Sequence, residues 1–133
     1  MKMNFDQMPD TVLEHFNGGE GTFIAKMFND GKCKILRGLL KPGCSIGMHT
    51  HKTNSEVIYV LSGTGKMLMD DGEETLTAGD VHYCPQGHSH SFINESDADL
   101  LILDDDLSIS WVIAKGKVLM EEKEIIVKGM YED

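Results

Sequence analysis

Five of the six histidines of this chain lie between residues 49 and 90, where their spacing favours a shared site. His49 and His51 are two residues apart, so both side chains project from the same face of a β-strand. Glu56 follows after four residues that can form a turn, and a neighbouring antiparallel strand lies about 5 Å away. Its carboxylate can therefore approach the same point as the two imidazoles. His90 follows a second turn signal and adds a third imidazole.

Three neutral imidazoles and one carboxylate suit a divalent transition metal such as Fe, Mn, Ni, Co or Zn. A six-coordinate ion held by four protein atoms would keep two positions open for water, substrate or dioxygen. Open positions distinguish a catalytic metal site from a structural one. A lone His-x-His pair is more often solvated or packed in a core, so the prediction depends on all four residues together.

Two longer patterns around these residues resemble the two motifs of the cupin family at every specified position. The first is Gly43-x5-His49-x-His51-x4-Glu56-x6-Gly63, and the second, fifteen residues later, is Gly79-x5-Pro85-x-Gly87-x2-His90-x3-Asn94. The resemblance implies a double-stranded β-helix, a small jelly roll, over residues 20–103. It also implies that the metal is held by the residues that are here His49, His51, Glu56 and His90.

The rest of the chain is consistent with an all-β fold. From residue 21 onward, short strand-forming segments alternate with turns rich in Gly, Pro, Asn and Asp, which is typical of an antiparallel barrel or jelly roll. Residues 10–16 are instead expected to form one or two helical turns capped by Asp10. The expected strands are 22–28, 33–40, 45–51, 56–61, 65–70, 73–77, 81–84, 88–94 and 100–103.

A chain of 133 residues allows one domain. We predict a cupin barrel over residues 1–103, in which residues 1–20 form an N-terminal arm. The acidic triplet at 104–106 interrupts the last expected strand. Residues 104–133 are then predicted to be a C-terminal β extension that is not an independent domain.

The apolar residues of this extension are too dense for a disordered linker. They predict strands at 109–114 and 117–120, joined as a hairpin, and a further strand at 125–128. These segments resemble the closing strands of amidohydrolases of the β-aspartyl dipeptidase kind. That resemblance implies an accessory β segment and carries no activity.

His82, His88 and Tyr83 are further candidates for catalytic roles. An unperturbed imidazole titrates near neutral pH, so either histidine could exchange protons with a substrate. The alternative for His82 and His88 is a place at the barrel mouth or on the surface, and for Tyr83 it is core packing. Cys44 and Cys84, next to the motifs, are expected to be small core residues.

The charge composition argues against nucleic-acid binding, which needs a basic face. The net charge is −10, and Arg37 is the only arginine among the 12 basic residues. No apolar run approaches the ~20 residues of a membrane span, and the N-terminus lacks the apolar core of a signal peptide. Three cysteines without paired spacing fit a reducing compartment. We therefore expect a cytoplasmic protein with no membrane partner.

The expected partner is a small molecule that chelates the metal through two oxygens, such as a β-dicarbonyl, a hydroxy acid or a catechol-like diol. The single arginine makes sugar phosphates less suitable, because arginine supplies the bidentate grip on phosphate. The cupin resemblance implies a metal-dependent dioxygenase, isomerase, decarboxylase or lyase. The alternatives are a non-enzymatic small-molecule binder or sensor, and an oligomeric scaffold with a vestigial site.

A homodimer is expected from the fold class. A small jelly roll leaves an outer sheet face and strand edges uncovered, and association commonly hides them. Val57 and Tyr59 lie on the strand face opposite Glu56 and would contribute apolar surface to such an interface.

Overall fold

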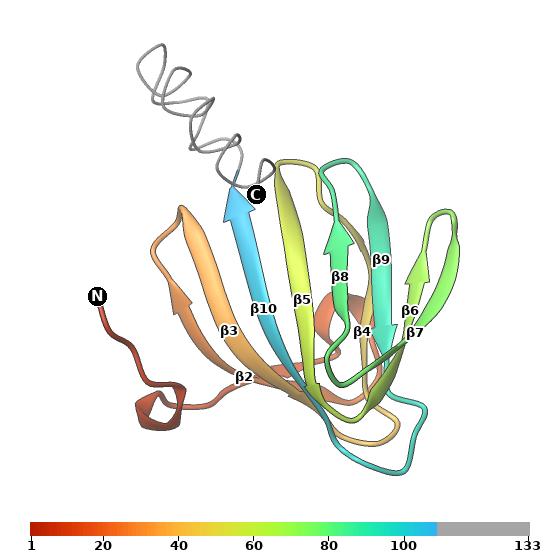
Figure 1. The fold of residues 1–133 in the computed structure, drawn as a ribbon, viewed down its shortest axis with the longest axis horizontal. Helices are drawn as coiled ribbons and strands as arrows, with labels where there is room; N and C mark the ends of the chain where they lie inside the picture. Colours follow the sequence, from red (N-terminus) through yellow and green to blue (C-terminus); the bar gives the residue numbers. More distant parts are fainter. Residues whose placement is uncertain (109–133) are drawn as a thin grey trace.

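Two antiparallel sheets enclose a common interior (Figure 1). The computed structural model describes residues 1–108, so the strands predicted at 109–114, 117–120 and 125–128 lie outside the described residues. The larger sheet has the order β1-β2-β3-β10-β5-β8, and the smaller has the order β4-β9-β6-β7. No helix within residues 1–108 is long and apolar enough to span a membrane. The arrangement confirms the predicted all-β jelly roll.

The described elements follow the predicted strands closely from residue 22 to residue 93. Boundaries differ there by up to two residues, as expected when turn residues rather than strand residues set the ends. The elements are η1 (Phe5–Gln7), β1 (Thr11–Glu14), η2 (Phe16–Gly18), β2 (Thr22–Asn29), β3 (Cys33–Leu40), β4 (Ser45–Thr50), β5 (Asn54–Ser62), β6 (Thr64–Met69), β7 (Gly72–Thr77), β8 (Val81–Cys84), β9 (Ser89–Ile93) and β10 (Leu100–Ser108).

Strand β5 shows why these segments form a two-faced sheet. Glu56, Ile58 and Val60 are buried, whereas Val57 and Tyr59 between them are exposed. Successive side chains of a strand point to opposite faces, so one face of β5 packs on the interior and the other meets solvent. The same alternation places the carboxylate of Glu56 on the interior face.

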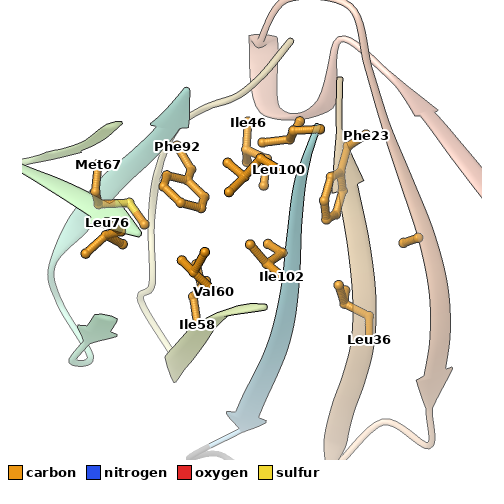
Figure 2. Close-up of a cluster of buried hydrophobic side chains, with 12 residues drawn as sticks. Phe23, Leu36, Ile46, Ile58, Val60, Met67, Leu76, Phe92, Leu100 and Ile102 are labelled. Carbon is orange, nitrogen blue, oxygen red and sulfur yellow. The ribbon is translucent and has the colours of Figure 1, made fainter. Parts of the chain in front are cut away.

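The apolar core lies between the two sheets (Figure 2). Strand β10 supplies Leu100 and Ile102, which are fully buried, and β9 supplies Phe92. Phe23 from β2 stacks on Phe16 of η2, with ring centroids 5.8 Å apart. Several core side chains, among them Phe23, Ile58 and Phe92, also line the interior cavity described below.

The last strand differs from the prediction that it ends at residue 103. β10 continues through Asp104 and Asp106 to Ser108, and it pairs with β3 on one side and β5 on the other (Figure 1). Pairing on both sides satisfies the backbone groups of the acidic triplet, which outweighs the low strand propensity of aspartate. The acidic triplet is therefore part of the sheet and not an interruption.

The helical turns predicted for residues 10–16 were also wrong for most of that segment. Thr11–Glu14 form β1, which pairs with the edge of β2 and brings Glu14 opposite Thr22. Only the short turn η2 follows it. The β-branched residues Thr11 and Val12 suit a strand, and pairing with a distant strand overrides a local capping signal.

Gly47 lets the N-terminal segment approach the site. A Cβ atom at this position would collide with the backbone carbonyl of Asn17, so only glycine allows η2 to pack directly against β4. The contact matters because Phe16 and Asn17 line the interior cavity described below.

Candidate metal centre

Four polar side chains meet in the interior, as the sequence predicted. His49 lies on β4 and His90 on β9, where they face each other as register partners. Glu56 lies on β5 in the opposite sheet. His51 follows the last residue of β4. The histidine–carboxylate cluster therefore bridges both sheets.

The second motif holds His51 in place through its backbone. The N–H of His51 donates to the carbonyl oxygen of His88 at 3.0 Å, and its own carbonyl accepts from the N–H of Gly87 at 2.6 Å. Gly87 has a φ of +89°, which favours glycine at this turn. The turn before β9 thus positions a residue of the first motif as well as His90.

The four ligand atoms lie close together. His90 Nε2 is 2.6 Å from Glu56 Oε1, 2.9 Å from His51 Nε2 and 3.1 Å from His49 Nε2. Glu56 Oε1 is 3.1 Å from His51 Nε2 and 4.0 Å from His49 Nε2. All three imidazoles therefore direct the same nitrogen, Nε2, to one point.

The opposite nitrogen of each ring determines where its proton lies. His49 Nδ1 is 2.8 Å from the carbonyl oxygen of Gly47, and His51 Nδ1 is 2.9 Å from the side-chain oxygen of Asn54. Both oxygens can only accept, so each Nδ1 must donate. In a neutral ring the Nε2 atom then carries a lone pair and no proton.

Hydrogen bonds that run through His82 to Glu74 determine the position of the His90 proton in the same way. His82 Nδ1 is 2.7 Å from a carboxylate oxygen of Glu74, and His82 Nε2 is 3.0 Å from His90 Nδ1. An ionised Glu74 accepts from His82 Nδ1–H, so a neutral His82 accepts from His90 Nδ1–H. His90 is thereby left with its lone pair on Nε2.

Neutral histidines thus bring three nitrogen lone pairs and one carboxylate oxygen to a single point, with no hydrogen atom between them. Four converging acceptors repel each other unless a cation lies among them. Imidazole nitrogen and carboxylate oxygen are the donors that divalent transition metals accept. The residues present therefore fit such an ion, although they do not identify which metal.

The electrostatics of the cluster also favour a cation. Where a proton rather than a metal ion occupies this point, burial still opposes ionisation of Glu56, yet hydrogen bonds from a protonated His51 or His90 hold the pKa of its carboxyl well below its ordinary value. The hydrogen bond with Glu56 outweighs burial and raises the pKa of His51. Burial lowers the pKa of His49. The lowered pKa favours the ionised carboxylate, which attracts positive charge.

The four side chains line one wall of a cavity of about 220 Å³. Apolar side chains from both sheets form much of its surface. These include Phe23, Leu36, Ile46, Ile58, Met67 and Phe92. A small organic molecule fits a space of this kind beside the four ligand atoms.

Two acidic residues of β10 and one lysine of β3 line the same cavity and were not predicted as site residues. Asp104 and Asp106 are buried, and Asp106 Oδ2 is 2.9 Å from Lys34 Nζ. The spacing of the two aspartates was a usable signal, because residues two apart share a strand face. The signal was missed because the strand was predicted to end at residue 103.

The other predicted candidates lie outside this cavity. His82 is buried behind His90, while Tyr83 and His88 are exposed, with His88 Nδ1 3.3 Å from Asp70 Oδ2. These three residues line a separate depression of about 130 Å³ on the outside of the site. A direct catalytic role for any of them stays a prediction.

Cys84 lies beside His82 and His90 and packs in the core, as expected. Burial raises the pKa of its thiol to about 11. Because the thiolate is the form that binds metals, a thiol with this pKa is a poor ligand near neutral pH.

Comparison with known proteins agrees with this geometry. The family model described as "Cupin domain" matches residues 37–105. The "Oxalate-binding protein" of Thermotoga maritima is 33% identical over 98 residues, which cover 68% of this chain and 80% of that protein.

Solved structures show the same fold. A predicted oxalate decarboxylase from Thermotoga maritima superposes with a TM-score of 0.76 and 26% identity, over 81% of this chain and 99% of that chain. A sugar phosphate isomerase of the cupin superfamily from Silicibacter pomeroyi superposes with a TM-score of 0.66 and 21% identity, over 80% of this chain and 75% of that chain. The second likeness concerns the fold alone.

Proposed function

This chain belongs to the cupin family, and we propose that it is a metal-dependent enzyme that acts on a small metabolite chelating the metal through oxygen. The observation that carries the proposal is the convergence of three Nε2 atoms and Glu56 Oε1 beside an internal cavity. We assign His49, His51, Glu56 and His90 as the metal ligands. A relative that binds oxalate, a small chelating molecule, supports the class of ligand.

A divalent ion held there would act as a Lewis acid on oxygen atoms of the ligand. The chain's own residues would hold the ion, fix the orientation of each imidazole and limit the access of water. Phe92, Met67 and Ile58 supply the apolar wall that separates a bound molecule from solvent. Reactions that fit are those of a dioxygenase, isomerase, decarboxylase or lyase.

A non-enzymatic binding protein is the second candidate. It is favoured by the relative at 33% identity, which is named for binding oxalate and not for a reaction. The same ligand set would then hold a metal that captures a small molecule without turnover.

One experiment separates the two functions. The protein is purified without added metal or chelator, its metal is identified, and a panel of β-dicarbonyls, hydroxy acids and diols is tested under air and under argon. Metal-dependent turnover supports the enzyme, and oxygen consumption with it indicates a dioxygenase. Tight binding without turnover supports the binding protein, and a chain that holds no metal contradicts both.

Replacing His82 with alanine is expected to weaken metal binding by about 10- to 100-fold, the usual effect of losing a partner that orients a ligand. The substitution leaves His90 Nδ1 without its acceptor, so the ring is free to turn or to change tautomer. Competition with a chelator of known affinity measures the change. His82→Gln restores an acceptor and should recover part of the loss, and unchanged affinity in His82→Ala would rule out the orienting role.

Metal affinity is expected to begin to fall above pH 6.5, the ordinary pKa of an imidazole, as the pH is lowered. His51 has a raised pKa in the metal-free cluster, so it takes up a proton at a higher pH than an ordinary imidazole, and a protonated ring cannot bind metal. Glu56 stays ionised over the same range. Metal content after dialysis over a pH series tests this, and constant content down to about pH 4 would contradict it.

A homodimer remains our prediction, and we place its interface on the outer face of β5 and β8. Val57 faces Tyr83 and Tyr59 faces Val81 on these neighbouring strands, and the four side chains are 37–59% exposed. Val81→Lys should shift the mass measured by light scattering from dimer to monomer, because a lysine would have to be buried at the interface. Val12→Lys, an exposed valine on β1 at the other sheet edge, is the control. A wild-type monomer of 14.8 kDa at micromolar concentration would refute the prediction.

A further inference from the structure

The internal cavity has a second polar wall that the metal ligands do not use. Asp104 and Asp106 lie two residues apart on β10 and share its inner face, whereas Asp105 between them is exposed. Asp104 is 4% exposed and Asp106 is 8% exposed. The Oδ1 atom of each is buried without a hydrogen-bond partner among the described residues.

These acids lie next to the histidine–carboxylate cluster. Glu56, Asp104 and Asp106 each place an oxygen within 4.8 Å of the others. Burial, the neighbouring charge of Glu56 and a hydrogen bond with Glu56 raise the pKa of Asp104. Burial and the charge of Glu56 also raise the pKa of Asp106, against the opposing effect of Lys34. Burial and mutual repulsion therefore make the charged forms of these carboxyl groups costly, and the Oδ1 atom of each aspartate still lacks a partner within residues 1–108.

The positive charge on this wall is already paired with a carboxylate. Lys34 Nζ, the one lysine or arginine nitrogen that lines the cavity within residues 1–108, is 2.9 Å from Asp106 Oδ2. Arg37 is bound on the outside, with its Nη2 2.6 Å from Asp6 Oδ1. The described cavity therefore offers no free guanidinium or ammonium group to a second carboxylate of a ligand.

Buried acceptors without partners are rare, and each costs free energy until a donor reaches it. A hydroxyl group supplies such a donor. A dianion such as oxalate supplies none, and it would add negative charge beside three carboxyl groups. The wall is thus complementary to a neutral hydroxylated molecule.

We propose that Asp104 and Asp106 form a hydroxyl-binding subsite, and that the ligand of this cavity is a neutral hydroxylated carbonyl compound. The inference rests on the proposed function, since the hydroxycarbonyl group would meet the metal while a further hydroxyl donates to Asp104 Oδ1 or Asp106 Oδ1. It sets this chain apart from its oxalate-binding relative in the charge of the ligand.

The test compares dihydroxyacetone with hydroxyacetone, which has the same hydroxycarbonyl group but lacks the second hydroxyl. Ligand-observed NMR titrations of the protein, carrying the metal with which it is purified, give both affinities. We expect dihydroxyacetone to bind about tenfold more tightly, the usual effect of giving a buried acceptor its missing donor. Equal affinities would mean that water satisfies both aspartates, and would overturn the proposal without any variant.

Three alanine variants locate the effect. Asp104→Ala and Asp106→Ala should each reduce the preference for dihydroxyacetone, and Asp106→Ala should also strengthen oxalate binding because it releases Lys34. Asp105→Ala, on the exposed face of the same strand, should leave both affinities unchanged. A preference that persists in Asp104→Ala and Asp106→Ala would overturn the assignment.

The metal-free protein separates this inference from the proposed function. Absence of bound metal in the purified chain would refute the metal-dependent function alone. The same titrations then still decide the subsite, since the two aspartates do not depend on the ion for their position in β10. In the metal-free protein, loss of the preference for dihydroxyacetone in Asp104→Ala would still support the subsite. Equal binding of dihydroxyacetone and hydroxyacetone would refute it.

Discussion

Replacing His90 with alanine is expected to reduce the metal content from about one ion per chain to nearly none. His90 is the centre of the cluster, because its Nε2 lies within 3.1 Å of ligand atoms from all three other residues. The substitution removes one of the four ligands, and it leaves His82 without the ring that it orients. Elemental analysis after gel filtration measures the metal content.

The matched control for this variant is His88→Ala. His88 lies two residues earlier, is exposed, and pairs with Asp70 on the outside of the barrel. Its replacement should leave the metal content unchanged. Full metal occupancy in folded His90→Ala would show that the ion is held elsewhere in the protein.

Replacing Ile102 with alanine is expected to lower the free energy of unfolding by about 2–5 kcal/mol, the usual cost of truncating a buried isoleucine. Ile102 is fully buried on β10, the strand that joins β3 to β5 (Figure 2). Removing its side chain opens a cavity at the centre of the core. Urea denaturation gives the change in stability.

Leu107→Ala on the same strand is the control for Ile102→Ala. Leu107 is 49% exposed, so its truncation should change the stability by about 0.5 kcal/mol or less. Ile102 does not line the cavity with the four ligands, so folded Ile102→Ala should still bind metal. Similar stabilities for the two variants would contradict the position of Ile102 in the core.

Local signals in the sequence were sufficient for most of the barrel. Gly63 and Gly79 have positive φ values and stand at turns that separate predicted strands, so the glycine pattern located the ends of those strands. The period of two in β5 correctly placed Glu56 inside and Val57 and Tyr59 outside. The four residues grouped by motif spacing also meet in space.

The errors arose where distant pairing decides the structure. Residues 11–14 carry a capping signal at Asp10, but the unpaired edge of β2 binds them as a strand. Residues 104–108 contain three aspartates, but β3 and β5 flank them on both sides. Neither neighbour is visible in a window of a few residues, so local propensity alone predicted the wrong structure.

The sequence by itself determined the fold class and the order of the middle strands, because these depend on periodicity and turn residues. It also identified the four converging side chains, through the two motifs that resemble those of the cupin family. Only the tertiary structure decided that Asp104 and Asp106 share the cavity with those side chains, and that His82 lies behind His90. Their places result from pairing between strands far apart in the chain. The polarity of the cavity, and with it the kind of ligand it accepts, is therefore a property of the folded barrel.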